Sequence, residues 1–262
     1  MKNRSALAQV LRLGVACLLL AASSVLAAEV KVMISGGFSA AYDELVPLFQ
    51  RATGNTVATV RGPSMGATPQ AIPNRLQRGE AADVVIVVGE ALDQLITQGK
   101  VAAGSRVDLA RSYIGLAVRA GTPKPDIGTV EALKRTLLDA KSIAFSDSAS
   151  GVYLSTELFP RLGIWDQIKD KSRMIPAEPV GAVVARGDAE VGFQQMSELK
   201  AVRGIEIVGA LPASAQKVTV FSAGIVAGAK EPVAAKALVD FLASPASSEA
   251  ITKSGMEPAK TR

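Results

Sequence analysis

The sequence predicts an α/β protein of two lobes, each built on a mostly parallel sheet flanked by helices. Strand-like runs rich in β-branched residues alternate with segments of helical periodicity, which is the pattern of parallel βαβ units. The chain also changes character twice, around residues 108 and 213, where a polar or Pro-containing loop leads into a further strand. We therefore expect 28–108 and 213–262 to form lobe 1 and 109–212 to form lobe 2, joined by two crossover segments.

The individual elements follow from residue type and spacing. The predicted strands are Val30–Ser35, Thr56–Val60, Asp83–Val88, Tyr113–Arg119, Ser142–Phe145, Glu190–Phe193, Ile205–Val208 and Val218–Val226. Helical periodicity predicts helices at about 38–53, 67–79, 90–99, 129–138, 151–163, 179–187 and 231–254, the last broken at Pro245. Phe38, Ala41 and Leu45 recur on one face of the first helix, so this face is expected to pack on a core.

Residues 1–27 are expected to be a secretory signal peptide. A basic start precedes an apolar stretch over 13–22, and small residues lead to an expected cleavage site after Ala27 or Ala28. The apolar stretch is shorter than the ~20 residues that a membrane span needs. Cys17 lacks the preceding leucine typical of lipidated cysteines, which disfavours a lipid anchor. The mature protein is therefore expected in the periplasm.

Composition excludes several kinds of chemistry. The sequence contains no histidine and one cysteine, so a Ser-His-Asp triad, a His-based zinc site and a disulfide framework are ruled out. We expect no cofactor and no metal ion bound by side chains. The formal charge of +5 falls to +2 without 1–27, which holds three basic residues and no acidic one. A nearly neutral protein gives no reason to expect nucleic acid as a partner.

Three turns place small residues where a strand or loop leads into a predicted helix. They are Ser-Gly-Gly-Phe-Ser at 35–39, Gly-Pro-Ser-Met-Gly-Ala at 62–67 and Ser-Asp-Ser-Ala-Ser-Gly at 146–151. The first N–H groups of a helix have no partner within the helix and attract anions. Serine and glycine are also ordinary helix caps, so one such turn is a weak indication. Three of them in a two-lobed chain predict an interlobe cleft that binds a small anion.

Several longer segments together resemble one known family. They are "ISGGFSAAYDELVPLFQRATG", "VRGPSMGA", "RGEAADVVIV", "SDSASGVYLSTELFPRLGI", "RGDAEVGFQQMSEL" and "KALVDFLASPASSEAI". Their order and spacing are similar to the periplasmic molybdate-binding proteins of ABC importers, which are type II solute-binding proteins, over essentially the whole mature chain. The resemblance implies a two-lobed fold that closes on a tetrahedral oxyanion and delivers it to a permease and ATPase in the inner membrane.

The same resemblance implies a set of ligand-binding residues. The first family serine falls near Gly37, within Ser35, Gly37, Phe38 and Ser39, and the second corresponds to Ser64, which Met65 follows. Loops that supply backbone donors correspond to Ser150, Gly151 and Val152, and to Pro179 and Val180. Tyr153, which follows the third turn, is a separate candidate for a side chain that reaches the cleft. The family tyrosine is replaced by Gln195. A tyrosine such as Tyr153, in the first turn of a helix, more often packs with its hydroxyl at the surface.

The replacement by Gln195 leaves the ligand open between molybdate and a small organic acid. An amide carries an acceptor as well as donors, whereas a dry oxyanion site requires donors only. Gln195 would have to turn its NH₂ group toward an oxyanion. Arg61 either pairs bidentately with a ligand carboxylate or is a solvated strand-end arginine.

Three classes of function remain from the sequence. The first is a catalytically inert, monomeric solute-binding protein of an ABC importer. The second is an exported serine-dependent enzyme that uses Ser64 or Ser150 with a lysine, although no Ser-x-x-Lys occurs at those turns. The third is a ligand-sensing domain of the same fold, which the signal peptide and the absence of a DNA-binding segment disfavour.

Overall fold

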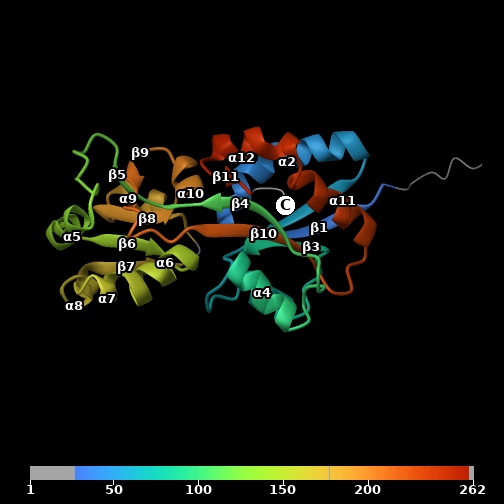
Figure 1. The fold of residues 1–262 in the computed structure, drawn as a ribbon, viewed down its shortest axis with the longest axis horizontal. Coiled ribbons are helices and arrows are strands. Elements are labelled where there is room, and N and C mark those ends of the chain that lie inside the picture. The colour runs from blue at the N-terminus through green and yellow to red at the C-terminus, as the bar shows by residue number, and fades with distance from the viewer. Residues whose placement is uncertain (1–26, 177, 260–262) are drawn as a thin grey trace, which may run out of the picture.

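The computed structural model describes residues 27–176 and 178–259 and has two lobes (Figure 1). Lobe 1 carries a six-stranded sheet in the order β11-β4-β10-β3-β1-β2, and lobe 2 a five-stranded sheet in the order β7-β6-β8-β5-β9. This confirms the two-lobed α/β fold. The expected signal peptide lies, apart from position 27, outside the described residues.

The sheet of lobe 1 is mixed. β1 pairs in parallel with β2 and β3, whereas β10 is antiparallel to β3 and β4, and β11 is antiparallel to β4. All five residues of β3, VVIVV, are buried, because helices cover both faces of this central strand. The strands are β1 Glu29–Ile34, β2 Thr56–Arg61, β3 Val84–Val88, β4 Val107–Ser112, β10 Thr219–Ile225 and β11 Glu257–Pro258.

The sheet of lobe 2 is built in the same way. β6 pairs in parallel with β7 and β8, and β5 is antiparallel to β8 and β9. The sheets thus hold more antiparallel pairs than the βαβ pattern suggested, because the strands next to the two crossings run against their neighbours. The strands are β5 Ile114–Arg119, β6 Ile143–Ser146, β7 Ser172–Ile175, β8 Val191–Gln195 and β9 Ile205–Ala210.

Helices cover the sheets. In lobe 1, α2, α11 and α12 lie on one side of the sheet and α4 on the other (Figure 1). The helices of lobe 1 are α2 Gly36–Thr53, α3 Ile72–Gln77, α4 Gly89–Thr97, α11 Pro232–Leu242, η3 Pro245–Ser247 and α12 Ser248–Ser254. Those of lobe 2 are α5 Val130–Asp139, α6 Ala149–Tyr153, η1 Leu154–Leu158, α7 Phe159–Arg161, α8 Trp165–Ile168, η2 Lys169–Lys171, α9 Val180–Arg186 and α10 Met196–Lys200. Among the described residues of both lobes, no helix combines the length and apolar character that a membrane span requires.

Two crossings join the lobes. The chain passes from β4 to β5 at Tyr113, and it returns through 211–218 between β9 and β10. β4 and β10 pair with each other and run across the middle of the molecule (Figure 1). β4 extends the first lobe to Ser112, beyond the expected boundary at 108. Segments from both ends of the described residues therefore contribute to lobe 1, whereas the sheet of lobe 2 is formed by one continuous segment.

Candidate functional site between the lobes

A cavity of about 360 Å³ lies between the lobes. Lobe 1 contributes the start of α2, the loop after β2, the end of β3 and the Phe221 ring of β10. Lobe 2 contributes the turn between β6 and α6, the residues before α9, the end of β8 and the first turn of α10. The carboxyl ends of the parallel strands meet here, as they do at the ligand sites of open α/β sheets.

Ser35 and Ser64 form the polar wall of lobe 1. The Ser35 N–H donates to the Ile86 carbonyl oxygen at 2.9 Å, but the Ser35 hydroxyl is buried without a hydrogen-bond partner among the described residues. The fully buried Ser64 hydroxyl accepts from the Val88 N–H at 3.1 Å. Ser64 therefore ties the loop after β2 to the end of β3, while Ser35 keeps a polar group unused at the cavity.

The glycine pair at the start of α2 makes room for two side chains. A Cβ at Gly36 would overlap the carboxyl group of Glu198, and a Cβ at Gly37 would overlap the ring of Phe221. The Ser197 hydroxyl also donates to the Gly37 carbonyl oxygen at 2.6 Å. The first turn of α10 in lobe 2 thus packs directly against the first turn of α2 in lobe 1.

The turn between β6 and α6 forms the opposite wall. The hydroxyls of Ser146 and Ser150 are 2.9 Å apart and share one hydrogen bond. A Cβ at Gly151 would overlap the Ser146 carbonyl oxygen, so only glycine allows the turn to close this tightly. Asp147, in the same turn, also lines the cavity.

Two glutamines and Glu198 complete the wall of lobe 2. Gln194 accepts from the Val180 N–H at 2.9 Å, and the Gln195 NH₂ group donates to the Thr219 hydroxyl at 2.9 Å. The buried Gln195 Oε1 has no hydrogen-bond partner in the described part of the chain. A Thr hydroxyl can donate as well as accept. Turning the Gln195 amide would therefore keep the Thr219 contact, now with Oε1 as acceptor, and place the NH₂ group where Oε1 now lies.

Glu198 has an unusual protonation equilibrium for a carboxyl group. It lines the cavity and is half-buried, and loss of hydration raises its pKa to about 7. Hydrogen bonds from the Gln194 side chain and the Gln195 N–H act in the opposite direction, and the charge of Asp147 adds to the increase. Glu198 therefore changes its charge near neutral pH.

The other charged residues at the cavity have partners. Arg61 donates to Asp43 at 2.6 Å and to the Ser39 hydroxyl at 2.7 Å, and its side chain is 48% exposed. Glu178 pairs with Arg186, which lowers the pKa of its carboxyl. Within the described residues no group of His, Cys, Asp and Glu is arranged to hold a metal ion. The anion-binding capacity of the cavity therefore comes chiefly from neutral donors.

Eight of the fourteen residues expected at the site line the cavity. They are Ser35, Gly37, Ser39, Arg61, Ser64, Ser150, Pro179 and Gln195. The other six do not. Phe38 and Val180 are buried in hydrophobic cores, and Gly151 packs against the Ser146 carbonyl oxygen inside the β6–α6 turn. Met65, Val152 and Tyr153 line a different groove. Tyr153 is buried and donates to the Ala215 carbonyl oxygen at 3.0 Å, so the expected surface position of its hydroxyl is wrong.

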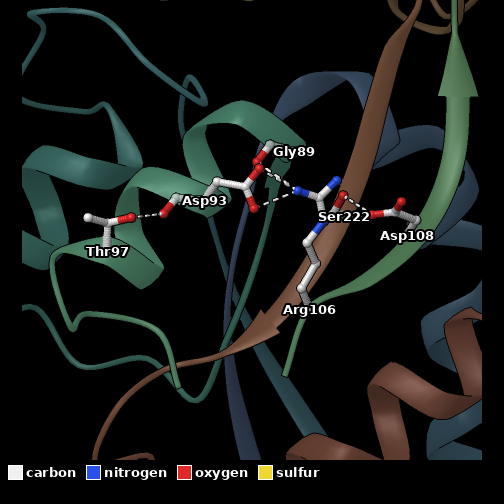
Figure 2. Close-up of polar contacts among 6 residues, drawn as sticks. All are labelled: Gly89, Asp93, Thr97, Arg106, Asp108 and Ser222. Carbon is white, nitrogen blue, oxygen red and sulfur yellow. Dashed lines mark hydrogen bonds and ion pairs between the residues drawn. The ribbon is translucent and has the colours of Figure 1, made fainter. Parts of the chain in front are cut away.

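That second groove, here called the ionic groove, lies across the crossings and contains Glu90, Asp93, Arg106, Glu157 and Lys217. The Arg106 guanidinium lies 2.6 Å from both oxygens of Asp93 and 2.9 Å from Asp108. Figure 2 shows this contact linking α4 to the strand that precedes the first crossing, with Ser222 of β10 donating to Asp108 at 2.7 Å. Lys217 lies 3.4 Å from Glu90 of lobe 1 and 3.3 Å from Glu157 of lobe 2.

Sequence reasoning missed Glu198, Asp147 and Gln194. A first-turn acid in a short helix is common, and nothing local marks Glu198 as a cavity residue. Two features of the sequence could have indicated Glu198. It follows the end of a buried strand by three residues, and the Gly36-Gly37 pair, which lacks side chains, leaves room for its carboxyl group. The contact joins segments about 160 residues apart, like the neighbouring Ser197–Gly37 bond.

Comparison with known proteins agrees with this architecture. A model of the family described as bacterial extracellular solute-binding protein matches residues 30–257. A molybdate-binding protein of Azotobacter vinelandii is 28% identical over 87% of this chain and 90% of its own. A solved structure of the Azotobacter vinelandii periplasmic molybdate-binding protein has a TM-score of 0.70 at 21% identity and covers 89% of this chain and 100% of that one. The resemblance to the molybdate-binding family is confirmed.

A further relative corrects one expectation. A Pseudomonas protein named aconitate isomerase is 54% identical over 94% of this chain and 95% of its own length. The expectation of a catalytically inert protein is contradicted by this finding, since so similar a relative is named as an enzyme. The absence of histidine excluded the usual hydrolases, but it did not exclude proton transfer by a carboxyl group such as Glu198.

Proposed function

The chain belongs to the bacterial extracellular solute-binding proteins, and we propose that it uses the interlobe cleft of that fold to bind and isomerise aconitate. The observation that carries the proposal is the 54% identity, over 94% of the chain, to a protein named aconitate isomerase. At that identity, over nearly the full length of both chains, the two proteins share their fold. The proposal requires that the cavity of this chain suit a tricarboxylate.

The size of the cavity supports an organic acid. Its 360 Å³ would hold on the order of ten water molecules at ~30 Å³ each. A single tetrahedral oxyanion would fill a small part of that space, whereas an unsaturated tricarboxylate would fill much more of it. The cavity also lies within the range of about 300–1,000 Å³ that is usual for small-ligand pockets.

The donors of both lobes suit carboxylate groups. Ser35 and Ser64 lie on one wall and Ser146 and Ser150 on the other, so one ligand can be held by both lobes. The first N–H groups of the long helix α2 face the same space and favour negative charge. Arg61 supplies positive charge at the rim, where its Asp43 partner is exposed and replaceable by a ligand carboxylate.

The chemistry requires no cofactor. Aconitate is a propene with a carboxylate on each carbon, and moving its double bond by one position interconverts the two geometric isomers. One C–H bond breaks at the methylene carbon and one forms at the former vinylic carbon, so no oxidant or reductant is consumed. The protein has to supply donors for the carboxylates and a group that accepts and returns one proton.

Direct assay of the purified mature protein tests this function. We expect trans-aconitate and cis-aconitate, incubated separately with the protein, to reach the same mixture of isomers, followed by proton NMR or liquid chromatography. Protein inactivated by heat and protein-free buffer are the controls. If neither isomer changes at micromolar protein over hours, the proposed activity is wrong.

A second role is supported by the family and by the uncharged donors of the cavity. We propose that the protein resides in the periplasm and passes a bound small anion to an ABC permease and ATPase. Calorimetric titration with molybdate, tungstate, sulfate and a panel of di- and tricarboxylates separates the two ligand classes. Tight molybdate binding that survives Arg61→Ala would favour oxyanion capture, whereas a response to tricarboxylates alone would favour the organic acid.

A further inference from the structure

We propose that Glu198 is the catalytic residue that carries the proton during isomerisation, an inference that rests on the proposed function. Its carboxyl group projects from the first turn of α10 in lobe 2 and ends against Gly36 at the start of α2 in lobe 1. A ligand held between the lobes therefore meets this group. Gly36 is the residue that leaves space for it.

The other ionisable groups at the cavity suit the task less well. The Arg61 guanidinium is paired with Asp43, and the ion pair with Arg186 lowers the pKa of Glu178, which makes Glu178 a weak base. The described cavity residues include no histidine, cysteine, lysine or tyrosine. Asp147 is the remaining carboxyl at the cavity. It lies on a shorter side chain in the tight β6–α6 turn.

The surroundings of Glu198 hold it in place and tune it. The Gln194 amide and the Gln195 N–H donate to its carboxyl, and Gln194 is itself fixed by the Val180 N–H. The charged groups facing it are Asp147 and Glu178 on the same wall of lobe 2, Arg61 of lobe 1, and the positive end of α2. Removal from water raises the pKa of Glu198 to about 7, which suits a group that must both take up and release a proton near neutral pH.

The step balances with one carboxyl group. Ionised Glu198 removes a proton from the methylene carbon, and the electron pair of that C–H bond spreads over the three propene carbons and their carboxylates. The double bond re-forms between the central carbon and the former methylene carbon. Glu198 then returns the proton to the former vinylic carbon, which lies two bonds from the site of removal, across the central carbon, and within reach of the same group.

Isosteric substitution tests the assignment. We expect Glu198→Gln to lower kcat by about a hundredfold or more, the usual contribution of a positioned acid or base. Tricarboxylate binding, measured by calorimetry with propane-1,2,3-tricarboxylate, should persist. Glu131→Gln is the matched control, since Glu131 is an exposed first-turn acid of α5 in the same lobe. Asp147→Asn should still isomerise aconitate, with a changed KM and a pH profile shifted to lower pH, because the charge of Asp147 adds to the raised pKa of Glu198.

Three readouts separate proton transfer from a structural role. In D₂O the product should gain deuterium to the extent that protonated Glu198 exchanges with solvent before it returns the proton, and Glu198→Gln should abolish this gain together with turnover. The value of kcat/KM should rise with pH through about 7, because the free enzyme must hold Glu198 ionised. Glu198→Asp should restore part of the activity with a shifted profile.

A measurement without turnover keeps the two proposals distinguishable. Binding of propane-1,2,3-tricarboxylate beside Glu198 should cause proton uptake at pH 7.5, seen as a buffer-dependent heat that is lost in Glu198→Gln. A wild type that binds with proton uptake but does not isomerise would refute the activity and retain the contact. An active wild type whose Glu198→Gln variant keeps kcat would overturn the assignment, as would full loss of activity in Asp147→Asn alone. No binding and no turnover would overturn both proposals.

Discussion

The interlobe cavity and the ionic groove lie at the same junction, but their polar groups are arranged in opposite ways. In the groove the charges pair with one another: Arg106 is held by Asp93 and Asp108, and Lys217 by Glu90 and Glu157. In the cavity the Ser35 hydroxyl and Gln195 Oε1 are buried without partners among the described residues, and Glu198 lies where its charged form is disfavoured.

The difference separates structure from function. A buried polar group without a partner costs free energy, so native proteins keep few of them, and those that remain need an explanation. The groove stabilises the junction by satisfying its own charges, and it leaves little for a ligand to bind. The cavity keeps a hydroxyl and an amide oxygen that have no partner among the described residues.

The largest effect is expected for the stability of Glu198→Gln. The raised pKa means that ionised Glu198 destabilises the folded state, a cost that grows between pH 4.5, the unfolded value, and about 7, and is complete above pH 7. Glutamine removes that charge, so we expect the free energy of unfolding at pH 8 to rise by on the order of 1–3 kcal/mol. Urea denaturation at pH 8 and pH 4 measures it. A variant that is less stable at pH 8 would contradict the raised pKa.

Ser64→Ala should be nearly as large, in the opposite direction. The substitution leaves the buried Val88 N–H without its acceptor, which costs about 1–3 kcal/mol. Thermal denaturation followed by circular dichroism should show the loss with no ligand present. Thr97→Ala is the control, because the exposed Thr97 hydroxyl only donates to a carbonyl of its own helix (Figure 2). Equal losses in both variants would mean that the Ser64 contact is not a buried anchor.

Ser35→Ala should separate binding from stability. The hydroxyl has no partner within the described residues, so its removal should leave the free energy of unfolding unchanged or slightly raised. Tricarboxylate affinity should fall by about 1 kcal/mol, roughly fivefold, because the ligand loses one neutral hydrogen bond. Calorimetry and denaturation on the same preparation give both numbers. A stability loss with unchanged affinity would place the role of this hydroxyl within the fold.

The smallest effect is expected in the ionic groove. Lys217→Met keeps a side chain of similar length but removes the ammonium group, and with it the contacts to Glu90 and Glu157 on opposite lobes and the contact with the Tyr153 ring. Partly exposed ion pairs typically contribute about 0.2–1 kcal/mol. We expect less than a fivefold change in affinity, and a difference that disappears at high salt. A salt-independent loss of ligand binding would show that the groove takes part in recognition.

The sequence predicted the parts of the fold that have a strong local pattern. The buried run VVIVV and the apolar face of α2 are recognisable because their periods match their elements. The strand β4, VDLARS, was missed because it carries Asp108 and Arg111 and looks like a polar loop. The two-residue strand β11 forms only where the end of the chain meets β4, a contact that no local pattern reports.

The candidate site shows the same limit. Ser35 and Ser64 stand in small-residue turns that end strands, so their place in the cavity could be predicted. Phe38 follows Ser35 in the first turn of α2 and Val180 begins α9, but both point into cores, because neighbouring residues of a helix face different directions. Glu198 was missed because it enters the cavity only through the packing of α10 on α2, which depends on how the lobes meet.

The passage of the chain between lobes also sets the order in which the molecule can fold as it emerges from a ribosome or a membrane pore. The strands of lobe 2 span the continuous segment 114–210, and they can pair as soon as that segment is free. Lobe 1 must wait for β10, which fills the place between β3 and β4 and is formed by 219–225. Until then, the hydrogen-bonding edges of those two strands stay open, and open edges are where unfinished chains aggregate. The sheet of lobe 1, which contains β1 from near the start of the chain, is therefore completed only by strands from the last fifth of the sequence.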